Sequence, residues 1–274
     1  MNIEANLRRL RSAALAVSTF AMAFLLAGLA EIGLGGMAVK AEYDRVAAIE
    51  ELARQASPFP DYYGRDELAS QYSHSSTAYV GEARFVSALE TLGWDSPSVV
   101  AAVVLLIAAL GLIVAAMFWV WRAHANLAQL RRGTKYSPAM VVAGYLIPGA
   151  NLLLPFEAMR ELHNRSHGEP EELAHAAVDD VTAWWTSVII GMLVFSAMLV
   201  KFVLDVGTNL IIMTPLWMEF AIASFAIILL LVSAYLFSRL ASTITQAQAD
   251  YLPQIDLEEE ILAPSRPRVV LVQE

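Results

Sequence analysis

Two histidines, His163 and His167, have the spacing in this sequence that most clearly suggests chemistry. Four positions apart on a helix, their imidazoles would lie on one face, where two nitrogens can bind a metal ion. The residues between them are Asn-Arg-Ser, so the glutamate that serves as base in helical zinc hydrolase motifs is missing. Little in the sequence constrains a third ligand. We therefore interpret the pair as part of a hydrated loop, and predict neither a metal site nor a cofactor.

A second group of candidates consists of ionisable residues at the edges of apolar stretches. Such groups are functional candidates because charges are costly inside a membrane. Lys201 and Asp205 are four apart and could pair on one helix face. Every member of this group lies near the predicted outer end of a span, where long side chains reach the interface. The group makes transport of ions or small solutes one hypothesis, and it comprises Glu31, Lys201, Asp205 and Glu219.

Other catalytic and binding signatures are missing from the sequence. It contains no cysteine, which excludes disulfides, thiolate metal ligands and cysteine nucleophiles. No serine or threonine stands in a nucleophile motif, and there is neither a phosphate-binding loop nor a dinucleotide fingerprint. The formal net charge of −9 argues against nucleic acid, which requires a basic surface. We therefore predict that the protein is not an enzyme and binds no nucleic acid.

The elements that must position these residues are long apolar runs. Hydrophobic residues make up 57% of the 274 positions and charged residues only 16%. A water-soluble core cannot bury that much apolar surface, whereas lipid accepts it. Uncharged runs long enough to cross a hydrocarbon core of about 30 Å occupy residues 12–30, 97–121, 138–156, 181–200 and 220–238. The sequence therefore predicts an all-α integral membrane protein.

The run 138–156 differs from the others because it contains helix breakers. Pro148 and Gly149 interrupt it and Pro155 follows, and each proline removes a helical hydrogen bond. Two structures are open: a kinked full span, or a re-entrant hairpin that enters and leaves on one side. A fifth full span would place the arginines that follow the run outside, against the positive-inside rule. We therefore expect four spans plus a broken hairpin, in a bacterial inner membrane with both termini cytoplasmic.

These elements divide the chain into four predicted regions. Residues 1–36 form an uncleaved transmembrane anchor, and residues 37–96 a small extracytoplasmic helical segment. Residues 250–274 are acidic and contain prolines, a composition typical of disorder. The membrane core at residues 97–249 contains spans at 97–121, 181–203 and 216–240, the broken segment 138–156, and an interfacial helix at 152–165.

The predicted interfacial helix has one apolar and one polar face. Glu161 and Arg165 have the favourable order for an ion pair between residues four apart. A helix of this kind lies in the membrane surface, and we expect it at the cytoplasmic interface. The apolar face contains Leu152, Phe156 and Met159, and the polar face contains Glu157, Arg160, Glu161 and Arg165.

A recognisable pattern begins at the end of the second span and continues through the broken segment. It resembles a family of bacterial membrane proteins known as domain of unknown function 4328, over roughly residues 95–245. The resemblance implies a multi-span membrane protein, and supplies no reaction, ligand or catalytic residue. The pattern runs Trp119-Val-Trp-Arg122-Ala-His-Ala-Asn126-Leu, Tyr136-Ser-Pro138, Tyr145-Leu-Ile-Pro148-Gly-Ala-Asn151-Leu, Pro155, Met159-Arg160-Glu161 and Trp184-Trp185.

The motif can be interpreted physically. Arg122 and Asn126 share one helical face, and we expect this face to hydrogen-bond the carbonyls freed at the 148–151 break, because arginine offers five donors. Ser137 before Pro138 has the pattern of an N-cap followed by the first helical position. The tryptophan pair at 184–185 is typical of the aromatic belt at a membrane interface.

Three functional hypotheses follow from these features. The first is a non-enzymatic scaffold that binds a partner or lipid, whose partners are the bilayer and either another membrane protein or further copies of the chain. The alternative is a small-solute or ion transporter, since discontinuous helices occur at transporter binding sites. A metal- or haem-linked enzyme subunit that uses the histidines comes third.

Overall fold

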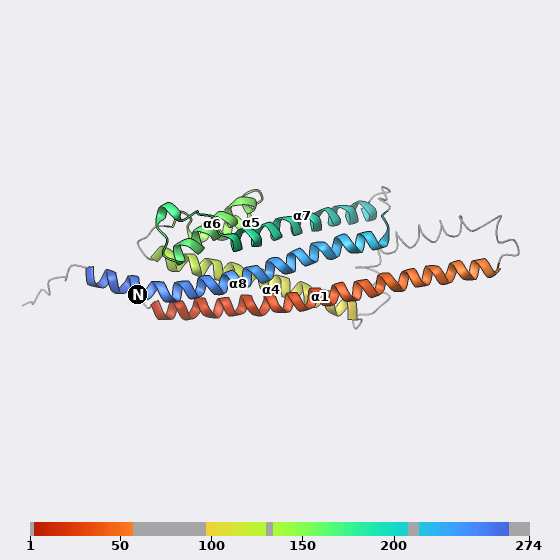
Figure 1. The fold of residues 1–274 in the computed structure, drawn as a ribbon, viewed down its shortest axis with the longest axis horizontal. Helices are drawn as coiled ribbons and strands as arrows, with labels where there is room; N and C mark the ends of the chain where they lie inside the picture. Colours follow the sequence, from red (N-terminus) through yellow and green to blue (C-terminus); the bar gives the residue numbers. More distant parts are fainter. Residues whose placement is uncertain (1–2, 57–96, 130–133, 208–213, 263–274) are drawn as a thin grey trace, which may run out of the picture. The chain divides into compact units, whose positions relative to one another are not determined.

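The described part of the chain is built from helices. The structure is a computed structural model that describes residues 3–56, 97–129, 134–207 and 214–262 (Figure 1). No strand occurs among these residues, so the predicted all-α class is confirmed. The elements are α1 (Ile3–Ala56), α4 (Pro97–Gln129), α5 (Pro138–Leu146), α6 (Ala150–Ser166), the short 3₁₀ helix η2 (Glu171–Leu173), α7 (Asp179–Gly207) and α8 (Leu216–Leu262).

Four of these helices are long and apolar enough to cross a membrane. The candidate spans are Glu4–Ile49, Val99–Ala128, Asp179–Lys201 and Leu216–Gln254. They agree with the four predicted spans, and the broken segment 138–156 is not among them. Large apolar side chains such as Val114 and Leu193 are strongly exposed on them, as expected where acyl chains surround a helix.

Two predicted boundaries do not correspond to helix ends. α1 has 54 residues, about 80 Å at 1.5 Å per residue, and it passes residue 36 without a break. The segment predicted at 37–96 therefore starts inside α1, and its residues 57–96 lie outside the described part. α8 likewise continues through residue 250 to Leu262, so the first half of the predicted disordered tail is helical, and residues 263–274 lie outside the description.

The starts of the helices follow from local chemistry. The Ser137 hydroxyl accepts a hydrogen bond from the Met140 amide at 3.2 Å, and Pro138 takes the first helical position of α5. This confirms the predicted cap, which satisfies a donor that has no partner inside the helix. α7 begins with Asp179 and Asp180 in its first turn, where carboxylates oppose the positive end of the helix dipole.

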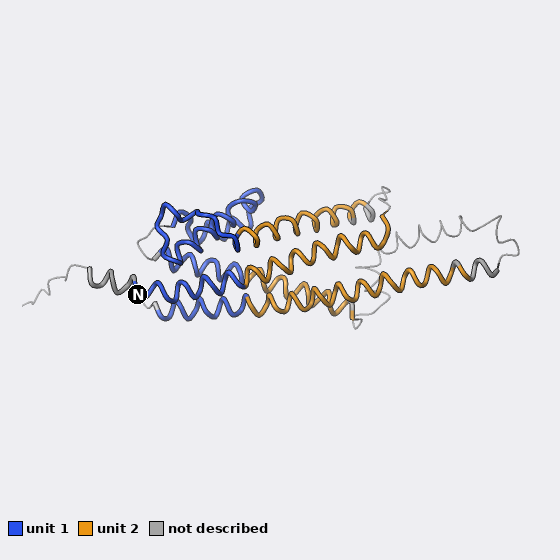
Figure 2. The backbone as a smooth tube through the Cα atoms, viewed as in Figure 1, with its two compact units in different colours: residues 1–17, 115–181, 239–274 blue, residues 18–114, 182–238 orange. Residues whose placement is uncertain are grey.

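The chain divides into two compact units (Figure 2). Unit 1 comprises residues 1–17, 115–181 and 239–274, and unit 2 comprises residues 18–114 and 182–238. Unit 2 contains most of the apolar lengths of α1, α4, α7 and α8. Unit 1 contains the ends of α1, α4 and α8 together with α5, α6 and η2. The polar motif residues at positions 122–165 all lie in unit 1.

Close helix packing in unit 2 depends on glycine. A Cβ added to Gly28 would lie 2.6 Å from Cδ2 of Leu231, and one added to Gly111 would lie 2.3 Å from Cε1 of Phe20. Both distances are shorter than carbon atoms tolerate, so α1 approaches α8 and α4 at positions that have no side chain. Small residues give membrane helices this close approach.

Candidate functional site

The broken segment folds back on itself as a hairpin of α5 and α6. Gly149 between the two helices has φ +85°, a left-handed conformation that favours glycine. A Cβ added to Gly144 on α5 would lie 2.2 Å from Cδ2 of Leu154 on α6. Residues ten apart in a continuous helix would be about 15 Å apart, so this contact excludes the kinked full span. Of the two open alternatives, the structure has the hairpin.

Local backbone hydrogen bonds stabilise the turn of the hairpin. The Ile147 amide donates to the Ala143 carbonyl at 3.0 Å, and the Asn151 amide donates to the Ile147 carbonyl at 3.0 Å. Pro148 has no amide hydrogen to satisfy. Pro155 lies inside α6 and is buried. Backbone groups of the hairpin itself therefore close much of the turn.

The expected role of Arg122 and Asn126 at this turn is wrong. Asn126 is buried, and its amide nitrogen donates to Oε1 of Gln248 on α8 at 3.2 Å. The Arg122 guanidinium lies 5.1 Å from the ring centroid of Phe118, and its Nε is buried without a hydrogen-bond partner in the described part of the chain. Neither side chain bonds to the 148–151 turn, since Asn126 is directed to α8 and Arg122 lies beside Phe118, one turn earlier on α4.

Gln248 connects three elements of unit 1. Its side-chain nitrogen donates to the Ala123 carbonyl at 3.1 Å and to the Ser166 hydroxyl at 3.0 Å, while its oxygen accepts from Asn126. One turn earlier on α8, the Thr245 hydroxyl accepts from the Trp119 indole nitrogen at 3.0 Å. The roles of Thr245 and Gln248 on α8 were not predicted from the sequence. Their three-residue spacing inside a helix was the available signal, but it did not identify their partners.

Two residues of the predicted polar face of α6, Glu161 and Arg165, are buried, contrary to their expected place at a hydrated interface, while Glu157 and Arg160 are half-buried. Glu161 is 2% exposed and Arg165 is 8% exposed. Glu161 accepts a hydrogen bond from the Lys135 amide at 2.5 Å, and Arg165 donates to the Glu169 carbonyl at 3.2 Å. The predicted Glu161–Arg165 ion pair does not form. Of the predicted apolar face, Met159 is buried, Phe156 is half-buried and Leu152 is exposed.

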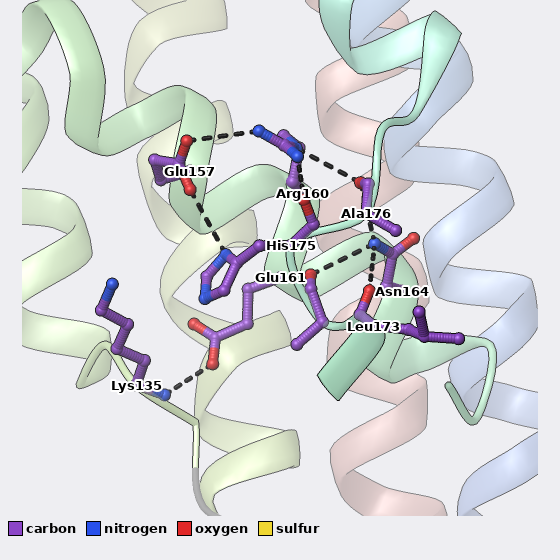
Figure 3. Close-up of polar contacts among 9 residues, drawn as sticks. Lys135, Glu157, Arg160, Glu161, Asn164, Leu173, His175 and Ala176 are labelled. Atoms are coloured by element: carbon purple, nitrogen blue, oxygen red, sulfur yellow. Dashed lines mark hydrogen bonds and ion pairs between the residues drawn. The ribbon is translucent and has the colours of Figure 1, made fainter. Parts of the chain in front are cut away.

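Two α6 side chains fix the backbone of residues 173–176, which comprise the last residue of η2 and the three residues after it (Figure 3). The Asn164 amide nitrogen contacts the carbonyls of Leu173, Ala174 and Ala176 at 3.1, 3.2 and 3.1 Å. Arg160 donates from Nε to the Ala176 carbonyl at 3.3 Å and from Nη2 to the His175 carbonyl. We call this arrangement the α6 clamp.

Two contacts of Glu157 extend the α6 clamp. Arg160 also bonds Glu157 at 3.3 Å, and the second carboxylate oxygen of Glu157 lies 3.3 Å from Nδ1 of His175 (Figure 3). The His175 ring contacts the ring of Tyr136 edge to face at 6.3 Å. The clamp residues therefore serve mainly to order backbone and neighbouring side chains.

Two of the outer ionisable residues, Lys201 and Glu219, form an ion pair. Lys201 lies 2.9 Å from Glu219, and Thr214 donates to the same carboxylate. The side chain of Asp205 lies outside the described residues, so its expected pairing with Lys201 stays a prediction. Glu31 is half-buried on α1. The structure thus brings together Lys201 and Glu219 of the predicted cluster.

The tryptophan pair divides between core and surface of unit 2. Trp184 is 4% exposed, and its ring centroid lies 5.4 Å from that of Phe237 and 5.1 Å from that of Trp185. Trp185 is half-buried. Trp184 is therefore a packing residue and does not occupy the exposed position that an interfacial belt requires.

The histidine pair is stacked. The rings of His163 and His167 have centroids 4.3 Å apart, and Nδ1 of His167 lies 2.7 Å from the His163 carbonyl. Burial lowers the pKa of His163, and a contact with Asn164 partly opposes this. Within the described ranges, no three histidine or carboxylate side chains are placed to hold a metal ion.

Comparison with known families agrees with the resemblance seen in the motif residues. A family model described as domain of unknown function (DUF4328) matches residues 85–242, which is more than half of the chain. Searches of curated proteins and of solved structures gave no match. The matched range contains α4 to α7 and most of the apolar length of α8. With its four candidate membrane spans and the hairpin between the second and third, the chain therefore belongs to the DUF4328 family.

Proposed function

We propose that the chain is a non-enzymatic membrane scaffold that binds a partner protein through the surface presented by residues 169–176. The observation that supports this is the α6 clamp, in which Asn164 and Arg160 hold the backbone of residues 173–176. Ordering one residue of backbone costs about 1–2 kcal/mol. A segment that is already ordered binds a partner without that cost, so a preorganised loop favours recognition.

The chemistry of this surface suggests the kind of partner. Glu169, Glu171 and Glu172 are exposed, and Leu173 among them is also exposed. An apolar side chain within an acidic rim is complementary to a basic segment that carries an apolar residue. The distribution of arginines in the sequence favours a cytoplasmic place for this surface, in a bacterial inner membrane.

Transport of ions or small solutes is the alternative function. It depends on the outer ionisable residues, of which Lys201 and Glu219 neutralise each other at 2.9 Å. An ion that used either group would first have to open that pair. The scaffold proposal requires no such rearrangement.

Native mass spectrometry of the tagged chain, extracted gently from its host membrane, tests the proposal. We expect a stoichiometric partner protein with the wild type and its loss with Glu171→Lys. The matched control is Asp250→Lys, which makes the same charge reversal at an exposed position of α8 and should keep the partner. Equal retention by both variants would exclude the surface. If neither the wild type nor a variant retains a partner, the transport alternative would be favoured, and ion-flux assays on Lys201→Met and Glu219→Gln would test it.

A further inference from the structure

The tip of the α5–α6 hairpin is apolar and exposed. Leu146 is 65% exposed and Leu153 is 71% exposed, and Ile147 and Leu152 beside them are exposed as well. No charged residue occurs from Pro138 to Phe156. The exposure of Leu153 is close to that of Leu193 at 70%, a residue on candidate span α7. Exposure of such a tip to water would be unfavourable, because the transfer of apolar side chains out of water lowers the free energy.

Cation–aromatic pairs mark the base of the hairpin on both legs. On the entry leg, Nζ of Lys135 lies 5.1 Å from the ring centroid of Tyr136. On the exit leg, the Arg160 guanidinium lies 5.2 Å from the ring centroid of Phe156. The Lys135 amide also donates to Glu161, which joins the two legs at this level. Aromatic residues with lysine or arginine are typical of the boundary between lipid and water.

The length of the legs corresponds to one leaflet. α5 has nine residues, about 14 Å at 1.5 Å per residue. The α6 leg from Ala150 to Phe156 is about 10 Å long by the same rise. A hydrocarbon core of about 30 Å leaves about 15 Å for each leaflet. A hairpin whose base lies at the interface therefore reaches toward the bilayer centre and does not cross it.

We propose that the α5–α6 hairpin is a re-entrant wedge, whose tip inserts among the phospholipid acyl chains of one leaflet. Its turn is the costly part of such an insertion, because lipid accepts no hydrogen bonds. Pro148 lowers that cost because it lacks an amide hydrogen, and the amides of Asn151 and Leu152 bond within the turn. The wedge does not depend on the partner-binding surface at residues 169–176.

Depth-dependent fluorescence quenching tests the insertion. The chain has no cysteine, so Leu153→Cys gives one labelling site in the full-length protein. The labelled protein is reconstituted in vesicles of phosphatidylethanolamine and phosphatidylglycerol, with nitroxides attached to the acyl chains or iodide dissolved in the water. Leu193→Cys on α7 is the control for lipid contact, and Glu169→Cys is the control for exposure to water.

The expected result is that the label at residue 153 behaves like that at residue 193. Its fluorescence emission should be blue-shifted, and it should be quenched by the acyl-chain nitroxides and not by iodide. The label at residue 169 should be quenched by iodide alone. Quenching of the residue 153 label by iodide would overturn the proposal, because the tip would then lie in water. Quenching by neither iodide nor nitroxide would also overturn it, because protein would then cover the tip. Cross-linking at residue 153 would show whether that cover is a second copy.

Labelling from one side tests whether the hairpin stays in one leaflet. Single cysteines at Lys135 and Glu169 lie on the entry and exit sides of the hairpin. Both should react with a membrane-impermeant maleimide from the same side of the vesicle. Reaction from opposite sides would show a full crossing and would overturn the wedge, whatever the native mass spectrometry finds.

Discussion

Replacing Asn164 with leucine tests whether the α6 clamp holds residues 173–176. The Asn164 amide nitrogen contacts three backbone carbonyls between 3.1 and 3.2 Å, and the side chain is buried. Leucine fills a similar volume and donates no hydrogen bond. The substitution therefore removes the donor and leaves the carbonyls of Leu173, Ala174 and Ala176 with one interaction fewer.

The expected loss of stability follows from the number of donors. One amide has two hydrogens, so at most two of the three contacts are strong at one time. A buried acceptor that loses its donor costs about 1–3 kcal/mol, and a typical hydrogen bond contributes about 1 kcal/mol net. The contact to Ala174 is buried, while those to Leu173 and Ala176 are partly open to water. We expect a loss of about 2–4 kcal/mol in total.

Thermal unfolding of the full chain in detergent measures this loss, and limited proteolysis within residues 171–178 reports whether the segment loosens. Asn151→Leu is the matched control on the same helix, because its side chain is half-buried and bonds no residue in the described ranges. Asn164→Leu should lower Tm by several degrees and speed cleavage, whereas the control should change both little. Equal effects of the two substitutions would refute the role assigned to the clamp.

Three further predictions concern other parts of the structure. Gln248→Ala should lower the free energy of unfolding by about 1–3 kcal/mol, because it leaves buried groups on α4 and α6 without partners; exposed Gln246→Ala, compared in the same thermal melt, should have almost no effect. Gly111→Ala should cost about 1–3 kcal/mol by overpacking, whereas Gly33→Ala should not, because nothing lies within 4 Å of a Cβ there; equal Tm values for these two variants would contradict the packing of unit 2. Burial lowers the pKa of His163 in the folded chain, so the stability that neutral His163 contributes is complete above the unfolded pKa of about 6.5 and declines as the pH falls below that value. His163→Gln should therefore flatten the dependence of Tm on pH. An unchanged dependence in this variant would exclude His163 as its origin.

The sequence was sufficient for features that depend on neighbouring residues. Apolar runs of spanning length predicted the four candidate membrane helices, because lipid requires each span to satisfy its own backbone hydrogen bonds. Ser137 and Pro138 predicted the start of α5, and Pro148 with Gly149 predicted the break before α6. These signals act within a few residues of the chain, so they do not depend on which elements pack against the helices that they start or end. The arginines after the break favoured a hairpin over a kinked span, and the contact between Gly144 and Leu154 distinguishes the two directly.

The partners of the polar motif residues were decided by tertiary structure. Asn126 bonds Gln248, which is 122 positions away, and no local pattern indicates that pairing. Glu161 and Arg165 were assigned to a hydrated face because polar residues on an amphipathic helix usually face water. In this chain both are buried, Glu161 bonded to the Lys135 amide and Arg165 to the Glu169 carbonyl. Where lipid surrounds much of the protein, polar groups find hydrogen-bond partners inside it, so the direction of a polar face depends on the elements packed around it.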